Sequence, residues 1–160
     1  MRTHPTIENV QYNACAALLN LASNGRYSEI PGQDSNVAAA ILAAMRAYRT
    51  NEGLQVNACL ILAKLAGGSD HNRVVLAQDL NAGADIINAM RAHRESERLQ
   101  ESACTAIFFL MLDHRSSRIL ISLGAREAVS EAYQRFPSSD ICQEAHAELE
   151  QMNSSYYGSR

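Results

Sequence analysis

The sequence repeats one apolar, alanine-rich segment at a nearly constant spacing, and this repetition limits the possible fold more than any other feature. The three clear copies are Val10–Ala22, Leu54–Ala66 and Leu99–Leu110. Cys59 follows Cys15 by 44 residues, and Cys104 follows Cys59 by 45. A fainter fourth copy, Ile141–Met152, has His146 at the position of the cysteine. Helical segments repeated at intervals in the low forties are typical of a stacked helical solenoid.

The composition supports an all-helical fold and argues against two other classes of protein. The chain has 160 residues, of which 47% are hydrophobic, and it contains no Trp and only three Pro. The charged fraction of 19% is too low for a disordered chain. The formal net charge is -3, whereas a nucleic-acid binder normally carries a clustered basic face. We therefore expect no nucleic-acid partner.

The four cysteines raise the question of disulfides or a metal site, and their spacing answers it. Cys15, Cys59 and Cys104 occupy the same point of successive copies, so each is expected to be a small buried apolar residue between helices. No pair has the C-x-x-C spacing of a zinc site. We therefore expect no disulfide, no metal and no cofactor. Reduced thiols fit a cytoplasmic or nuclear protein.

Membrane and export signals are not visible in the sequence. The N-terminal residues lack the apolar core of a signal peptide. No apolar run approaches the roughly 20 residues of a membrane span. The chain is expected to be soluble and to have no membrane partner.

Periodic apolar residues and helix-breaking residues predict the order of the helices. Pro31–Gly32 is expected to prevent a helix after the first copy, and Pro137 is expected to end the helix before the last copy. The expected helices cover residues 7–23, 37–49, 54–66, 72–80, 84–94, 99–112, 116–123, 125–136 and 141–152, followed by a polar tail at 153–160. Each full unit is thus a short helix, a second helix and a long third helix.

The turn between the short helix and the second helix has its own sequence signal. Asn81 and Gly124 occupy equivalent positions there, and Asn36 occupies the same position one unit earlier. Gly and Asn are the residues that tolerate a left-handed backbone conformation. We therefore expect left-handed turns at all three positions. The second helices also repeat, because Ala89–Arg94 follows the similar segment Ala44–Arg49 by 45 residues.

The domain organisation follows from the same units. We expect one repeat domain over residues 1–152, with a partial repeat at 1–25, repeats at 26–66, 67–112 and 113–152, and the tail beyond. The chain neither begins nor ends at a unit boundary. Two alternatives therefore stay open, a short array with atypical end units and a piece of a longer solenoid.

Several segments resemble the armadillo repeat family. The resemblance rests on Asn72–Ala77, Asn81–Ala84, Ile86–Arg91 and Leu99–Cys104, with Ala17–Ala22 similar to the end of a third helix. It covers about residues 7–152, where helix order, turn residues and period all agree. HEAT repeats are the neighbouring class, but their two-helix units fit the turns at Asn81 and Gly124 less well. The resemblance implies an all-α, right-handed α-α superhelix whose third helices line a concave surface.

The resemblance also implies a surface that binds a protein or an extended peptide. In the family, an asparagine late in the third helix holds the peptide backbone, and here it is kept only at Asn20. Lys64 and Phe109 replace it in the other copies, so a continuous asparagine ladder is absent. The family's aromatic position, four residues earlier, is also not aromatic here. The candidate partner-binding residues lie four apart on each third helix and share one face: Tyr12, Ala16, Asn20, Val56, Leu60, Lys64, Glu101, Thr105 and Phe109.

Several of the remaining features have both a functional and a structural interpretation. Asp70–His71 and Asp113–His114 are acid-histidine pairs, but Asp before a helix is an ordinary cap, and we expect that role. Phe109 is either an exposed binding anchor or part of the core. Arginines recur at the ends of the second helices, where they complement the helix dipole or form a basic stripe on the convex side: Arg46, Arg49, Arg91, Arg94 and Arg135.

The function expected from these observations is non-catalytic. No nucleotide-binding loop, nucleophile elbow or metalloprotease motif occurs in the sequence. We therefore predict an interaction or scaffold module that binds a protein or peptide through its third-helix face. The alternative is a structural fragment that associates with itself, or with further repeats, through exposed helix faces at its ends.

Overall fold

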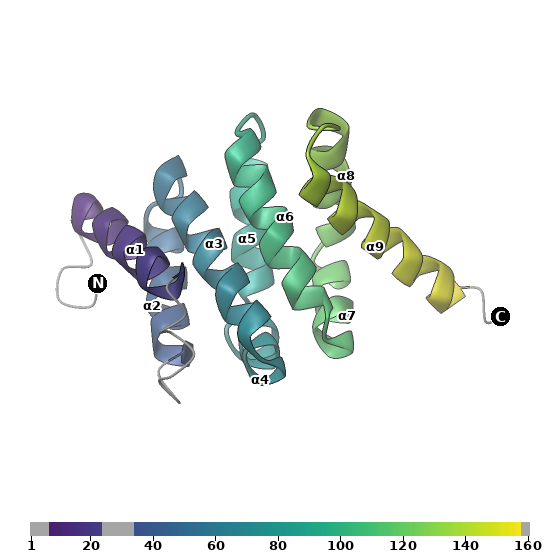
Figure 1. Cartoon of the computed structure of the whole chain (residues 1–160), viewed down its shortest axis with the longest axis horizontal. Coiled ribbons are helices and arrows are strands. Elements are labelled where there is room, and N and C mark those ends of the chain that lie inside the picture. Colours follow the sequence, from purple (N-terminus) through teal and green to yellow (C-terminus); the bar gives the residue numbers. More distant parts are fainter. Residues whose placement is uncertain (1–6, 24–33, 158–160) are drawn as a thin grey trace.

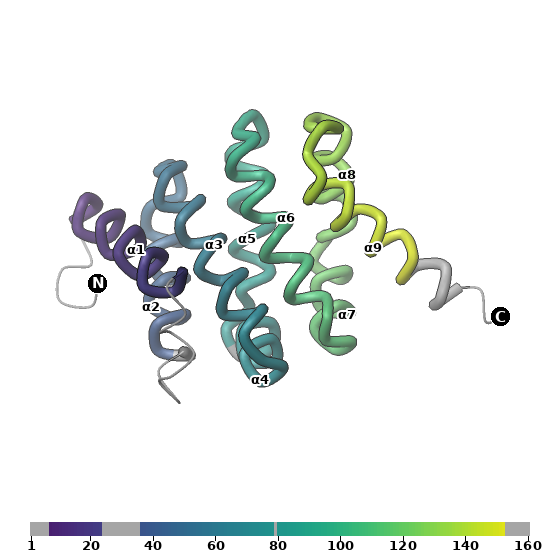
Figure 2. The backbone as a smooth tube through the Cα atoms, viewed as in Figure 1, coloured from purple at the N-terminus to yellow at the C-terminus, as the bar shows by residue number. Residues whose placement is uncertain are grey.

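The chain forms a stack of helices in two layers (Figure 1). The computed structural model describes residues 7–23 and 34–157, and every regular element in these two ranges is helical. The long third helices form one layer and pack against one another in sequence order: α1 (Glu8–Ser23), α3 (Glu52–Gly68), α6 (Glu97–Met111) and α9 (Asp140–Tyr157). The backbone advances along this stack without closing on itself (Figure 2). The predicted all-α solenoid is confirmed.

The second helices form the other layer, which lies behind the third helices in Figure 1. They are α2 (Asp34–Ala47), α5 (Ala82–Ala92) and α8 (Ala125–Arg135). The short helices are α4 (Asp70–Val74), which continues into a π-helical turn at Val75–Asp79, and α7 (His114–Ser122). The predicted order of short, second and third helix is therefore confirmed for the units that begin at α4 and α7. None of the described helices combines the length and the apolar character needed to cross a bilayer.

Apolar side chains between the layers and between successive repeats form one continuous core. Cys15, Cys59 and Cys104 each have 0% of their surface exposed, so the predicted equivalence of these positions is confirmed. His146, at the same position of the fourth copy, is half-buried instead. Its ring stacks on the ring of Tyr133 in α8, with 4.8 Å between the ring centroids. This histidine thus packs against a neighbouring helix.

Two of the three predicted left-handed turns are present. Asn81 has φ 53° and Gly124 has φ 88°, and each directly precedes a second helix. The prediction for Asn36 is wrong, because α2 begins at Asp34 and Asn36 lies within its first helical turn. The turn at Asn81 or Gly124 connects two helices that follow closely in the chain. Asn36 instead lies two residues after the start of α2, so it continues a helix.

The last helix is longer than predicted. α9 continues to Tyr157, so most of the expected tail is helical backbone. No Pro or Gly interrupts the chain between Met152 and Tyr157, and Gly158 is the first helix-breaking residue. The expectation about Pro31–Gly32 falls outside the described residues.

Buried glutamines connect each second helix to the third helix that follows it. Gln55 and Gln100 occupy equivalent positions in α3 and α6, and their side chains are only 2% and 3% exposed. Each Nε2 group donates two hydrogen bonds of 2.9–3.0 Å to backbone carbonyls at the end of the preceding second helix. Carbonyls in the last turn of a helix have no N–H partner within the helix, so the glutamines satisfy acceptors there. The acceptors are the carbonyl oxygens of Met45, Tyr48, Met90 and His93. The carbonyls of Tyr48 and His93 also accept a hydrogen bond of 3.1 Å from the backbone N–H of Asn51 and Ser96.

Candidate partner-binding face

The third-helix face is the side of α1, α3, α6 and α9 that points away from the second helices. Most of the candidate residues reach its surface. Tyr12, Asn20 and Lys64 are exposed, and Ala16, Leu60, Glu101, Thr105 and Phe109 are half-buried. Val56 is only 2% exposed. α3 packs between α1 and α6, so only a narrow part of its surface is exposed, and Val56 is not in that part.

Two aromatic rings on this face lie over glycines of α3. A Cβ atom on Gly53 would lie 2.9 Å from Tyr12 Cε2, and a Cβ atom on Gly67 would lie 3.5 Å from the Phe109 ring. The missing side chains therefore leave room for a ring from the helix on either side. Phe109 also contacts Phe108 edge to face, with 5.8 Å between the ring centroids. The Phe109 ring is thus half-buried against the neighbouring repeat and is neither fully exposed nor fully part of the core.

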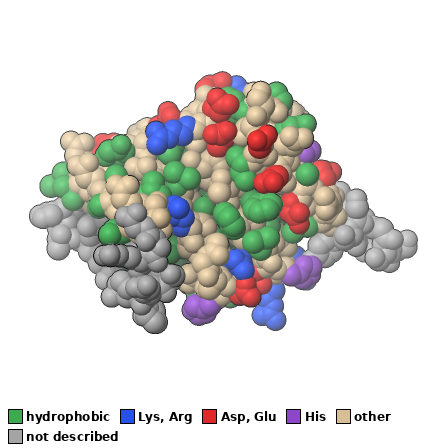
Figure 3. Space-filling view, viewed as in Figure 1, with side chains coloured by type: hydrophobic (Ala, Val, Ile, Leu, Met, Phe, Trp, Pro, Cys, Tyr) green, Lys and Arg blue, Asp and Glu red, His purple; other side chains and the backbone are tan. Residues whose placement is uncertain are grey.

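The chemical character of the face changes along the stack. Space-filling side chains show apolar groups near its centre and acidic groups toward α9 (Figure 3). Phe108 and Phe109 of α6 are half-buried, and the adjoining Leu112 is 54% exposed. The carboxylates are on α6 and α9, and none of them is buried: Glu97, Glu101, Glu144 and Glu148. Sequence reasoning missed Phe108, Leu112, Glu144 and Glu148. With His146 as the equivalent of Cys104, the candidate positions of the fourth copy fall on Gln143 and Ala147 instead of the two glutamates.

Polar contacts tie the starts of the third helices together. The Asn51 side chain, which caps α3, donates a hydrogen bond of 2.6 Å to Glu8 of α1. Ser96, which caps α6, donates one of 2.6 Å to Glu52 of α3. Ser139, directly before α9, donates one of 2.9 Å to Glu101. A residue at each helix start thus contacts a glutamate of the preceding third helix, which sets the relative position of successive repeats.

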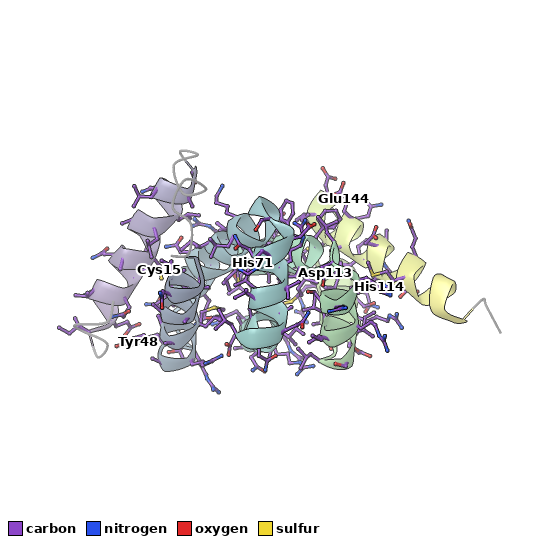
Figure 4. All side chains as sticks on the ribbon, turned by 90° about the horizontal axis from the view of Figure 1, so that it is seen from below. Cys15, Tyr48, His71, Asp113, His114 and Glu144 are labelled. Carbon is purple, nitrogen blue, oxygen red and sulfur yellow. The ribbon has the colours of Figure 1, made fainter. Side chains whose placement is uncertain are left out.

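The two acid-histidine pairs serve local structure. Asp113 caps α7 and accepts hydrogen bonds of 2.7 Å from both the backbone N–H and the hydroxyl of Ser116. These bonds lower the pKa of the Asp113 carboxyl below its usual value. Asp70 instead forms an ion pair with Arg73, and Ser69 caps α4. Figure 4 shows His71 on α4, and Asp113 and His114 at the start of α7. The cap prediction is therefore confirmed for Asp113 and wrong for Asp70.

The arginines at the ends of the second helices are partly paired with carboxylates. Arg46 lies 2.8 Å from Asp85 and also donates a hydrogen bond of 3.3 Å to the Leu80 carbonyl. Arg94 lies 3.8 Å from Glu131, and Arg135 pairs with Glu95. Arg46, Arg49 and Arg91 line a hollow of about 340 Å³ between α2 and α5, together with Asp85. The carboxylates therefore interrupt the basic stripe that the sequence left as an alternative.

All four cysteines are buried and free. Burial raises the pKa of Cys15 to about 11 and that of Cys59 to about 12. Cys104 donates a hydrogen bond to Cys142, which raises the pKa of Cys104 and lowers that of Cys142. This contact joins α6 to α9 and was not expected from sequence, because Cys142 is not one of the repeated cysteines. Among the described residues, no three metal-ligating side chains come together.

Comparison with known proteins identifies the repeat type. The family model described as LRRK2 ARM repeat matches residues 1–152. No curated protein and no solved structure gives a significant match. The match covers the stack from α1 through most of α9, so it includes every element of the third-helix face. The armadillo resemblance noted in the sequence is confirmed.

Proposed function

Because the chain belongs to the LRRK2 ARM repeat family, we propose that it is a cytoplasmic, non-catalytic scaffold that binds a protein or extended peptide on its third-helix face. The family supports a repeat scaffold for protein interaction. The exposed apolar surface around Leu112 supports the choice of face. Leu112 is 54% exposed beside two half-buried phenylalanines, and a partner that covers this surface lowers the free energy of the complex. The aspartates of both acid-histidine pairs are engaged in local contacts, which supports a non-catalytic role.

A pull-down from cytoplasmic extract tests the face. We expect the Phe109→Ala, Lys64→Glu double variant to lose partners that wild type captures, because it removes an aromatic contact and reverses a charge on the same face. A matched variant on α7, Ile119→Ala with Arg115→Glu, makes the same kinds of change away from this face and should keep them. Identical partner sets for wild type and the face variant would reject the third-helix face as the binding site.

Self-association is the alternative function, and a specific observation favours it. Ile7, directly before α1, is 48% exposed, and Leu21, near the end of α1, is 52% exposed, so this outer helix presents apolar surface. Stacking of a second copy would cover it. Light scattering at increasing protein concentration distinguishes the two functions. A mass that rises for wild type and stays monomeric for Leu21→Asp would support stacking, whereas a constant wild-type mass would count against it.

A further inference from the structure

The carboxylates on the third-helix face take part in none of the ion pairs between described residues. The described ion pairs use Asp70, Asp85, Glu95, Glu131 and Glu150. None of these residues is one of the four face carboxylates. Glu97, Glu144 and Glu148 have no ion pair within the described ranges, and Glu101 has only the hydroxyl of Ser139. This part of the surface is therefore left with uncompensated negative charge.

Helical spacing brings these carboxylates to one place. Glu97, Glu101 and Phe108 lie on the side of α6 that faces α9, since Ser139 and Cys142 contact Glu101 and Cys104. Glu144 and Glu148 are four residues apart on α9, and Figure 4 shows Glu144 projecting away from the body of the stack. The core of α9 instead uses Cys142, Ala145 and Leu149. The negative charge is thus spread along two neighbouring helices.

Apolar surface lies directly beside this charge. Phe108 is only seven residues from Glu101 on the same side of α6, and Leu112 continues the apolar surface by one turn. Figure 3 shows acidic groups next to apolar ones on this part of the face. An occupant of the α6–α9 part therefore meets carboxylates and aromatic rings together.

We infer that the partner of this face is an extended protein segment in which Lys or Arg alternates with apolar residues. Its cations lie against Glu97, Glu101, Glu144 and Glu148, and its apolar side chains cover Phe108, Phe109 and Leu112. Opposite charges raise the association rate and exclude acidic competitors, while the apolar contacts supply most of the affinity. The inference rests on the proposed function and adds the chemistry of the partner.

Fluorescence anisotropy with short labelled peptides tests the inference. The probe contains repeated Leu-Lys-Ser, and the reference peptides contain Leu-Glu-Ser or Ser-Lys-Ser. We expect the Leu-Lys-Ser peptide to bind best and to bind more weakly as salt is added. The variant Glu97→Gln, Glu144→Gln, Glu148→Gln should weaken binding by about tenfold, since each exposed ion pair contributes roughly twofold. Phe108→Ala with Leu112→Ala should weaken it independently.

A charge-matched control removes the general effect of net charge. Glu127→Gln, Glu131→Gln, Glu150→Gln also removes three carboxylates, but from α8 and from the side of α9 near Arg126, and it should bind the probe as wild type does. Equal binding by the two triple variants, or no binding of the Leu-Lys-Ser peptide, would overturn the inference. Tight binding of the Leu-Glu-Ser peptide that Phe108→Ala with Leu112→Ala abolishes would also overturn it. That last result would still uphold the proposed function, because the face would bind a peptide of the opposite charge.

Discussion

Gly83→Val is expected to destabilise the protein by about 3 kcal/mol or more, because the first turn of α5 lies directly against α7. A Cβ atom at Gly83 would lie 2.5 Å from Leu120 Cδ2 and 3.3 Å from Leu123 Cδ1. Leu120 is 0% exposed, so it has no free space into which it could move. Gly83→Ala should also be destabilising, although alanine favours helix by roughly 1 kcal/mol over glycine. Urea unfolding followed by circular dichroism measures both changes.

Gly68→Ala is the matched control for this prediction. Gly68 is in the last turn of α3, and the nearest atom to its added Cβ would be Asn72 Nδ2 at 3.8 Å, an ordinary contact. This variant should therefore be neutral or slightly more stable than wild type. If Gly83→Ala were as stable as Gly68→Ala, the close approach of α5 and α7 would be contradicted.

Alkaline pH is expected to destabilise the protein through its buried thiols. Burial raises the pKa of Cys59 from 9.0 to about 12, so the folded state keeps a neutral thiol where the unfolded chain has a thiolate. The contribution of Cys59 to stability is complete below pH 9 and is lost as the pH rises through about 12. A shift of this size corresponds to at most about 4 kcal/mol. Cys15, whose pKa is raised to about 11, acts in the same direction.

The free energy of unfolding measured as a function of pH tests this expectation. Cys59→Ala removes the titrating group, so its stability should fall less steeply than that of wild type above pH 9. Ile61→Val is the control, because it removes core volume from the same helix and retains every thiol. Its stability should be lower at all pH values but fall as steeply as in wild type. Identical slopes for wild type and Cys59→Ala would show that Cys59 does not contribute.

The polar contacts between successive third helices bear on how the face functions. Hydrogen bonds from Asn51, Ser96 and Ser139 reach glutamates of the preceding third helix. Such contacts define the angle between repeats, and a binding surface composed of several repeats depends on that angle. Glu101 belongs both to this set of contacts and to the acidic part of the face. A charge change at Glu101 is therefore expected to affect binding and the position of α9 together.

Some features could be predicted because they depend only on nearby residues. The spacing of Cys15, Cys59 and Cys104 indicated a repeated helix with one buried side, and all three are fully buried. Asn81 and Gly124 indicated left-handed turns, because few other residues adopt that backbone conformation. Helix periodicity and backbone preference are local properties, so the sequence alone was sufficient for the fold class and for most of the helices.

The composition of the face required the tertiary structure. Val56 and Lys64 lie on the same helix at positions expected to share a face, yet Val56 is buried and Lys64 is exposed. Phe109 is half-buried because Gly67 of another helix leaves space for its ring. The carboxylates of α6 and α9 form one acidic surface only because these helices are neighbours in the stack. Helical spacing determines which side chains share one side of a helix, whereas the exposure of each depends on the helices packed against both flanks.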